Sequence, residues 1–252
     1  MANRLLAHLQ ALFKWALDRE RVTASPIIGI RKPGDELSRD RYLSDDELPD
    51  VLRAIERESY PWSPIFRLLL STGQRKNDVA AAKRSDCNLP RRELTIPRQR
   101  AKNKTSHVVP LTDEAVAIIE ALPVINGSDY LFPAMRGGKK TVSGFGRAKA
   151  RLDKIITAIR AERGEDPLPE WTVHDLRRTV ATGLERLGVP LPVTEAVLGH
   201  TSGSKKGVVA VYQRHEYREE KRRALEAWAR HLDGLRHPAS AAKVVALRSG
   251  AV

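Results

Sequence analysis

The chain has a single cysteine, Cys87, and this scarcity excludes several kinds of protein. One cysteine cannot form a disulfide within the chain, and it fits a protein of the reducing cytoplasm. It also leaves no cysteine-based zinc site, and the seven histidines never fall into HExxH or a similar ligand spacing. We therefore expect a cytoplasmic protein without a bound metal.

Long hydrophobic runs are also missing. No apolar stretch is long enough to span a lipid bilayer, and the N-terminus lacks the pattern of a signal peptide. Internal repeats and low-complexity segments are not visible either. With 252 residues, 41% of them hydrophobic and 30% charged, the chain can bury a sizeable core and has the composition of a folded soluble protein.

Positive charge is what the chain has in excess. Lysine and arginine together number 44, against 31 aspartate and glutamate residues, which gives a formal net charge of +13 at pH 7. Such an excess favours polyanionic partners, with nucleic acid first and an acidic membrane surface second.

Apolar residues recur at helical spacing near the start of the chain, at Leu5, Leu6, Leu9, Leu12, Phe13 and Leu17. An amphipathic helix of this kind needs a partner for its apolar face. It is either a terminal helix docked on the main domain or, as we prefer, the last helix of a truncated preceding domain. Proline and glycine then mark a linker, so we assign residues 1–36 to this helix and linker, 37–234 to the main domain and 235–252 to a flexible tail.

A helix junction near residue 73 places an arginine where it needs a partner. An apolar helical segment runs into Gly73, and helix resumes around Asp78. Arg75 therefore follows a buried segment, and a partly buried guanidinium must be paired or must face an anion. Asp78 could hold Arg75 for such an anion, or the two could form a purely structural ion pair.

From Arg92 to Pro110 the pattern changes from helical to strand-like. Residues 94–96 and 107–109 predict two strands of a hairpin, joined by a strongly basic turn. A solvated loop is the simplest interpretation of this turn. A lysine on a mobile turn, such as Lys102, can instead enter a phosphate site.

The stretch from Thr172 to Thr179 organises the rest of the chain. It opens a predicted helix that continues to Leu187, and it carries His174 and Arg177 one helical turn apart. A titratable imidazole beside a permanently charged guanidinium suits a site that holds a phosphate and moves a proton. Taken alone, the pair is also compatible with two surface residues that form no functional site.

Two further features follow toward the C-terminus. A short predicted helix ends at Gly199 and His200, and a basic loop leads from there to Tyr212. The last helix carries one apolar stripe, formed by Leu225, Trp228 and Leu232. We expect this stripe either to dock on a neighbouring protomer or to pack on its own domain.

Taken in order, these motifs resemble the catalytic domain of the tyrosine recombinases, specifically the phage-type integrases, over about residues 37–232. The motifs are Thr72-Gly73-Gln74-Arg75 with Asp78, the hairpin with Lys102, His174-Asp175-Leu176-Arg177, Leu198-Gly199-His200 and a following tyrosine. The resemblance implies a mainly α fold with a small antiparallel β-sheet (α+β). It also implies that the first helix ends the family's separate core-binding domain.

The resemblance assigns four side chains to the scissile phosphate. Arg75 and Arg177 match the two arginines that clamp this phosphate. His174 matches the position that accepts the nucleophile's proton or bonds a non-bridging oxygen. His200 matches a further hydrogen-bond donor to the phosphate. Bidentate guanidinium contacts stabilise the charge that builds up on a pentavalent phosphorus.

The resemblance also assigns the acid and the nucleophile. Lys102 aligns with the hairpin lysine that protonates the leaving 5′ oxygen, with Lys104 as its possible substitute. Tyr212 matches the nucleophile that forms a 3′-phosphotyrosyl link, and Tyr217 competes with it because the interval after His200 is long. The link conserves the energy of the phosphodiester, so the resemblance implies no metal, no ATP and no other cofactor.

The function implied is that of a site-specific DNA recombinase, an integrase of a prophage or mobile element. Its partners would be double-stranded DNA and copies of itself, in a tetrameric synapse, with no membrane and no small-molecule substrate. Basic side chains would contact backbone phosphates, namely Arg98, Arg100, Lys104, Lys205 and Lys206. The alternatives are DNA relaxation as by a type IB topoisomerase and a catalytically silent DNA-binding module.

Overall fold

A computed structural model describes residues 2–34, 40–101, 105–134, 140–200 and 217–237 of the chain. The chain divides into two compact units, residues 1–40 and residues 41–252, and each is described by itself. In the described ranges, no helix combines the length and the apolar character needed to cross a bilayer.

The first unit is built around helix α1 (Ala2–Leu17), which confirms the helix predicted there. Leu5, Leu12 and Trp15 on this helix are exposed. The side-chain amide of Asn3 donates to the Gly34 carbonyl at 2.7 Å and so ties the helix to the chain that follows it. Its assignment to a truncated domain stays a prediction.

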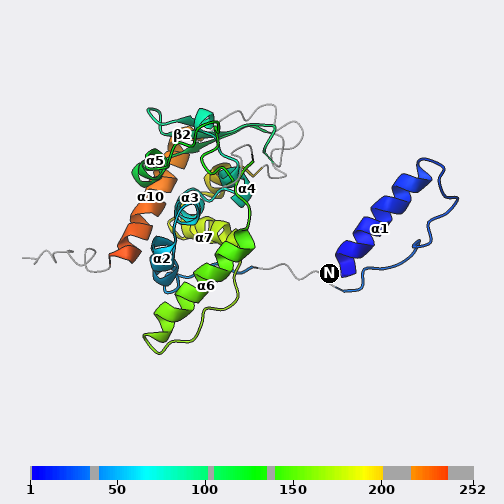
Figure 1. Cartoon of the computed structure of the whole chain (residues 1–252), viewed down its shortest axis with the longest axis horizontal. Coiled ribbons are helices and arrows are strands. Elements are labelled where there is room, and N and C mark those ends of the chain that lie inside the picture. Colours follow the sequence, from blue (N-terminus) through cyan, green and yellow to red (C-terminus); the bar gives the residue numbers. More distant parts are fainter. Residues whose placement is uncertain (1, 35–39, 102–104, 135–139, 201–216, 238–252) are drawn as a thin grey trace, which may run out of the picture. The chain divides into compact units, whose positions relative to one another are not determined.

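The second unit is mainly helical with one small sheet, as predicted (Figure 1). Its elements in chain order are α2 (Leu48–Arg57), α3 (Trp62–Thr72), α4 (Lys76–Ala80), the 3-10 turn η1 (Arg84–Asp86), β1 (Cys87–Asn88), β2 (Glu93–Ile96), β3 (His107–Pro110), α5 (Asp113–Glu120), α6 (Phe145–Ala161), α7 (Val173–Arg186), α8 (Leu191–Leu198) and α10 (Arg218–Arg236).

The three strands form an antiparallel sheet in the order β1-β2-β3. Leu94 pairs with Val109 and Ile96 pairs with His107, so the predicted hairpin is present. Leu94 and Ile96 are buried while Glu93 and Thr95, which alternate with them, are only partly covered; this is the alternation of a strand with one face on the core.

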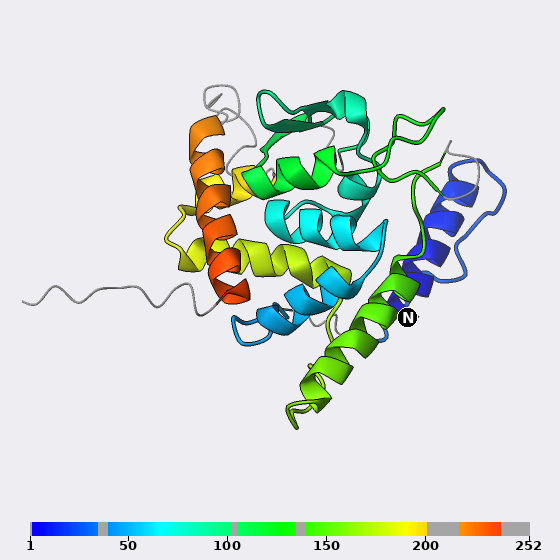
Figure 2. The same cartoon turned by 60° about the vertical axis from the view of Figure 1, so that its left-hand side comes forward.

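Helix α3 is the centre of the second unit and contacts α2, α5, α7 and α10 (Figure 2). Its apolar residues point to several sides and nearly all are buried, among them Ile65, Phe66, Leu69 and Leu70. A helix that is apolar around most of its circumference has to be enclosed by other elements. The Arg75 loop at its end is therefore anchored to the core.

Helix α10 closes this core. Leu225, Trp228 and Leu232 are each 1% exposed, and the Trp228 indole N–H donates to the Leu70 carbonyl at 2.8 Å. Gly183 on α7 makes room for the ring, since a Cβ there would lie 2.2 Å from Trp228. The stripe thus packs on its own domain, and the alternative of docking on a neighbouring protomer is wrong because no apolar face is left over.

Candidate active site

The loop that carries Arg75 is shaped by a glycine. Helix α3 ends at Gly73 with a φ of 65°, and a Cβ there would lie 2.9 Å from Val180 Cγ1. Glycine alone combines this backbone with such a close approach. The turn sets Arg75 at the N-cap of α4, with its side chain 25% exposed.

Asp78 lies close to Arg75 without binding it tightly. The shortest approach, from Arg75 Nη1 to Asp78 Oδ2, is 3.8 Å, which is too long for a hydrogen bond. Burial raises the pKa of Asp78, although the charges of Arg75 and Arg177 oppose that rise. The carboxylate therefore attracts Arg75, while the N–H groups of Arg75 remain available to an anion.

Helix α7 starts with a reciprocal cap. The Thr172 backbone N–H and hydroxyl both donate to Asp175 Oδ2, at 2.7 and 2.9 Å, and Arg178 binds the other oxygen of the same carboxylate. This capping box fixes the first turn. It thereby fixes the backbone from which His174 and Arg177 project.

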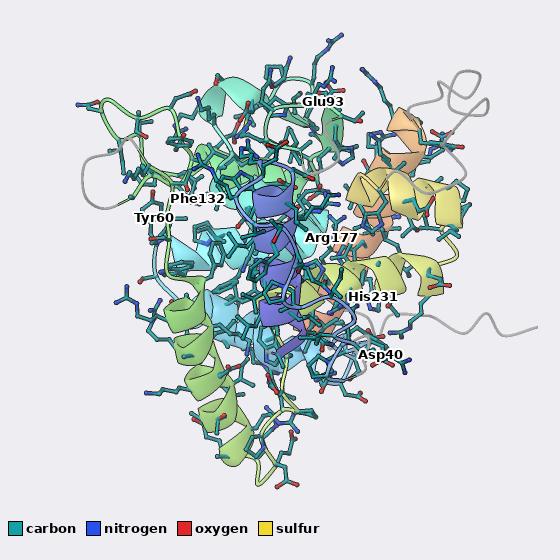
Figure 3. All side chains as sticks on the ribbon, turned by 90° about the vertical axis from the view of Figure 1, so that its right-hand side faces the viewer. Asp40, Tyr60, Glu93, Phe132, Arg177 and His231 are labelled. Carbon is teal, nitrogen blue, oxygen red and sulfur yellow. The ribbon has the colours of Figure 1, made fainter. Side chains whose placement is uncertain are left out.

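Arg177 connects three segments of the site, and Figure 3 labels it in the body of the second unit. Its side chain is buried, with Nη1 donating to the Gly73 carbonyl at 2.8 Å and Nη2 donating to the Leu198 carbonyl at 2.6 Å. Burial and the charge of Arg75 lower the pKa of Arg177 to about 10, which still leaves it positive at neutral pH. Arg177 therefore joins the Arg75 loop to the turn that precedes His200.

That turn is a second glycine cap. Helix α8 ends at Gly199 with a φ of 61°, and the His200 backbone N–H donates to the Glu195 carbonyl at 2.9 Å. This is the Schellman arrangement of a helix C-terminus. Because the backbone of His200 does the capping, its exposed imidazole is left to face the site.

The two arginines and two histidines share one electrostatic environment. Partial desolvation and then the charges of Arg177 and Arg75 lower the pKa of His200, and His174 acts on it too. The pKa of His174 is lowered by partial desolvation, then by Arg178, Arg177 and Arg75. His174 and His200 nonetheless remain exposed to solvent, whereas Arg177 is buried. The structure thus brings together four of the six residues that the sequence pointed to.

The other two predicted catalytic residues, Lys102 and Tyr212, lie outside the described residues. So do three of the predicted DNA contacts, Lys104, Lys205 and Lys206. The competing tyrosine, Tyr217, is described: it precedes α10 with a φ of 47° and packs partly buried against the core.

The two remaining basic residues of the hairpin differ. Arg98 is exposed, as a contact to DNA requires. Arg100 binds Asp86 and the Ala81 carbonyl instead of pointing to solvent. Its contact with DNA stays a prediction, and it requires this ion pair to open.

Sequence reasoning missed the residues that hold the site together. Gln74 Nε2 donates to the carbonyls of Thr72 and Val197, each at 2.8 Å, and His107 Nε2 lies 3.0 Å from that same Val197 oxygen. The two contacts to Val197 span 123 and 90 residues, so no local pattern shows them. The one available signal was a polar residue, His107, on an otherwise apolar strand.

No other part of the described structure competes as a site for this chemistry. A hollow of about 320 Å³ lies between α6 and the loop before α7, with Lys149, Asp153 and Trp171 in its wall, but it contains none of the four clustered residues. Within the described ranges, His, Cys, Asp and Glu side chains nowhere gather in a group of three that could hold a metal.

Comparison with known proteins identifies relatives along most of the chain. A sequence model of the phage integrase family matches residues 41–219. The chain is 27% identical to prophage integrase IntA of Escherichia coli K12 over 233 residues, which cover 90% of this chain and 53% of the relative. It is 25% identical to tyrosine recombinase XerD of Listeria innocua over 211 residues, which cover 78% and 66%. The chain spans about half the length of the prophage integrases that it matches.

Solved structures share the fold. A Tn1549 transposon integrase in complex with a circular intermediate DNA matches with a TM-score of 0.61 and 17% identity, over 89% of this chain and 78% of that one. A lambda integrase dimer bound to a COC′ core site matches with a TM-score of 0.56 and 19% identity, over 81% and 73%. A lambda integrase tetramer bound to a Holliday junction also matches with a TM-score of 0.56 and 19% identity, over 83% and 61%.

Proposed function

This chain belongs to the phage integrase family, and we propose that it carries the catalytic domain of a tyrosine-type site-specific DNA recombinase. The observation that supports this most is the position of Arg177. Its guanidinium bonds the end of α3 and the end of α8, and so gathers Arg75 and His200 around the helix that carries His174. Two cations and two imidazoles at one solvent-facing point suit a phosphodiester.

The arginines bind the phosphate. A guanidinium has five N–H donors. Arg177 donates one N–H from each of its two amino groups, Nη1 to the Gly73 carbonyl and Nη2 to the Leu198 carbonyl. Its remaining N–H groups and those of Arg75 are available to non-bridging oxygens. Because Arg177 is preorganised by the protein, it stabilises the extra negative charge of the pentavalent phosphorus without reorganising in the reaction.

The histidines hold or move protons. A lowered pKa keeps His174 and His200 neutral at neutral pH in the absence of DNA. A neutral His174 can accept the phenolic proton of the attacking tyrosine, and a bound phosphate then favours the resulting imidazolium. His200 donates its N–H to a non-bridging oxygen.

The covalent step exchanges one ester for another. The Tyr212 oxygen attacks phosphorus, the bond from phosphorus to the 5′ oxygen breaks, and Lys102 delivers a proton to that oxygen to give a free 5′ hydroxyl. The 3′ phosphate is then linked to tyrosine. Attack by the 5′ hydroxyl of a partner strand reverses the step and completes the exchange.

The partners in this proposal are double-stranded DNA and further copies of the chain. The net charge of +13 and the exposed Arg98 favour contact with backbone phosphates. Lambda integrase, which shares the fold, has been captured as a dimer on a core site and as a tetramer on a Holliday junction. We propose an equivalent synapse here, acting in the cytoplasm to integrate or excise a prophage or mobile element. The relatives favour neither a topoisomerase nor a silent DNA-binding module.

The test is covalent capture on DNA of unknown sequence. The protein is incubated with a library of duplexes that are randomised around a nick placed beside the scissile position, so that cleavage releases a short fragment and traps the adduct. Adducts that survive denaturation are isolated, their DNA is sequenced and the modified peptide is mapped. We expect Tyr212→Phe to abolish the adduct and Tyr217→Phe, its matched control, to retain it. Wild-type protein without an adduct, or an adduct that survives both substitutions, would contradict the proposal.

A further inference from the structure

The C-terminal end of α8 receives side chains from three separate segments. The Val197 carbonyl accepts from Gln74 Nε2 at 2.8 Å and pairs with His107 Nε2 at 3.0 Å, and the Leu198 carbonyl accepts from Arg177 Nη2 at 2.6 Å. The last carbonyls of a helix have no partner within the helix. Here the loop after α3, the strand β3 and the helix α7 supply those partners, directly before the residue His200.

The contact with the Val197 carbonyl shows which ring nitrogen of His107 carries a proton. A carbonyl oxygen can only accept, so Nε2 of His107 must carry a proton. Burial, followed by the charge of Lys221, lowers the pKa of His107 to about 4. The ring is therefore neutral at physiological pH, with its single N–H directed at Val197.

His107 also packs directly against the turn that carries His200. A Cβ at position 199 would lie 3.0 Å from Cδ2 of the His107 ring, so Gly199 and the imidazole are in close contact. The glycine is needed here both for its positive φ and for this approach. A shift of the His107 ring would consequently change the path of the backbone into His200.

The residue after His107 fixes another part of the same region. The Val108 carbonyl accepts from Nζ of Lys221 at 2.7 Å, and this lysine is buried on α10. Strand β3 thus contacts the end of α8 with one residue and α10 with the next. In the sequence, β3 follows the turn with Lys102 and α10 follows the segment with Tyr212.

We propose that His107 is a positioning residue of the phosphate site: its Nε2–H holds the end of α8 and so sets the His200 imidazole against Arg177. The proposal rests on the function proposed above for that site. In this proposal His107 acts through the turn before His200 and has no direct part in the chemical step. Without its N–H the Val197 carbonyl keeps only Gln74 among the partners in the described residues, and the Gly199 turn loses the ring against which it packs.

Three substitutions test the proposal. His107→Gln keeps an N–H donor at a similar reach, His107→Leu removes the donor, and His107→Asn keeps an amide that is too short to reach Val197. His237→Leu, at a histidine whose side chain is 66% exposed, is the matched control. For each variant of this chain we measure the single-turnover rate of adduct formation on the nicked duplex selected from the library, the affinity for that duplex, and the titration of His200 by NMR.

We expect His107→Leu and His107→Asn to slow adduct formation by about tenfold or more, as the loss of one buried hydrogen bond allows, with duplex affinity changed by less than about twofold. The His200 pKa should rise toward its ordinary value in both, since the ring becomes better solvated and leaves the field of the two arginines. His107→Gln and His237→Leu should behave as wild type.

The proposal is overturned if His107→Leu leaves both the rate and the His200 titration unchanged, or if His107→Gln is as defective as His107→Leu. Should His107→Leu not fold, the comparison of His107→Gln with His107→Asn decides. If wild-type protein forms no adduct at all, the proposed function fails, while the His200 titration still tests whether His107 positions that ring.

Discussion

Replacing Arg177 by methionine separates the catalytic use of its charge from its structural use. Burial and the charge of Arg75 lower the pKa of Arg177 to about 10, so its charged form is destabilised by about 3 kcal/mol. Methionine removes this cost. It also removes the donors to the Gly73 and Leu198 carbonyls, and leaving each buried oxygen without a partner costs about 1–3 kcal/mol.

The two effects oppose each other, so Arg177→Met should destabilise the fold by no more than about 3 kcal/mol. For a domain of this size that corresponds to a fall in Tm of at most about 12 °C. Adduct formation requires the charge and the N–H donors of Arg177 and should fall by about a thousandfold or more, as expected for an arginine that stabilises a phosphoryl transition state.

The assay combines thermal unfolding followed by circular dichroism with single-turnover adduct formation on the selected nicked duplex. Arg223→Met is the matched control, because the Arg223 side chain is 74% exposed on α10. The reasoning is refuted if Arg177→Met retains adduct formation within about tenfold of wild type. It is refuted equally if the variant unfolds so early that the guanidinium must be primarily structural.

Three further predictions concern packing, pH and salt. Gly183→Ala should destabilise the second unit by about 1–3 kcal/mol in urea unfolding because its Cβ would overlap Trp228, whereas Gly234→Ala, in open space on α10, should not destabilise it. The native state keeps His107 neutral down to a pH of about 4, whereas the same histidine in the unfolded chain is protonated below about 6.5. Lowering the pH from 7 to 5 therefore stabilises the unfolded state, and the unfolding free energy should fall by about 2 kcal/mol more in wild type than in His107→Gln. An equal fall in both would remove His107 as the cause. The logarithm of the duplex affinity should decrease linearly with the logarithm of the salt concentration, and Arg98→Gln should reduce the magnitude of that slope by about one. An unchanged slope would exclude Arg98 from the DNA contacts.

The parts of the fold that were predictable are those that local pattern determines. Gly73 and Gly199 end helices because each needs a positive φ, and that requirement is visible in the sequence as a glycine after an apolar helix. The spacing of His174 and Arg177 places them one turn apart on any helix. Alternating residues around Leu94 predicted a strand, and a strand is present there.

What could not be predicted depends on which surfaces meet. The stripe with Trp228 was visible as an apolar face, but only the position of Gly183 on α7 shows that the face belongs to the domain's own core. Arg100 stood in a basic run typical of a DNA contact, yet η1 ends at Asp86 and brings a carboxylate to it. His107 offered no motif at all, because its role comes from a carbonyl 90 residues away.

The central claim is that Arg75, Arg177, His174 and His200 bind one phosphoryl group together. Orthovanadate is an oxyanion that resembles phosphate and readily takes a fifth ligand, and it can be titrated into the protein while the guanidinium and imidazole resonances of these four residues are followed by NMR. The account predicts that all four respond along one binding curve with one equivalent of vanadate, and that Arg177→Met abolishes the response. Separate curves for the arginines and the histidines, or binding that survives Arg177→Met, would contradict it.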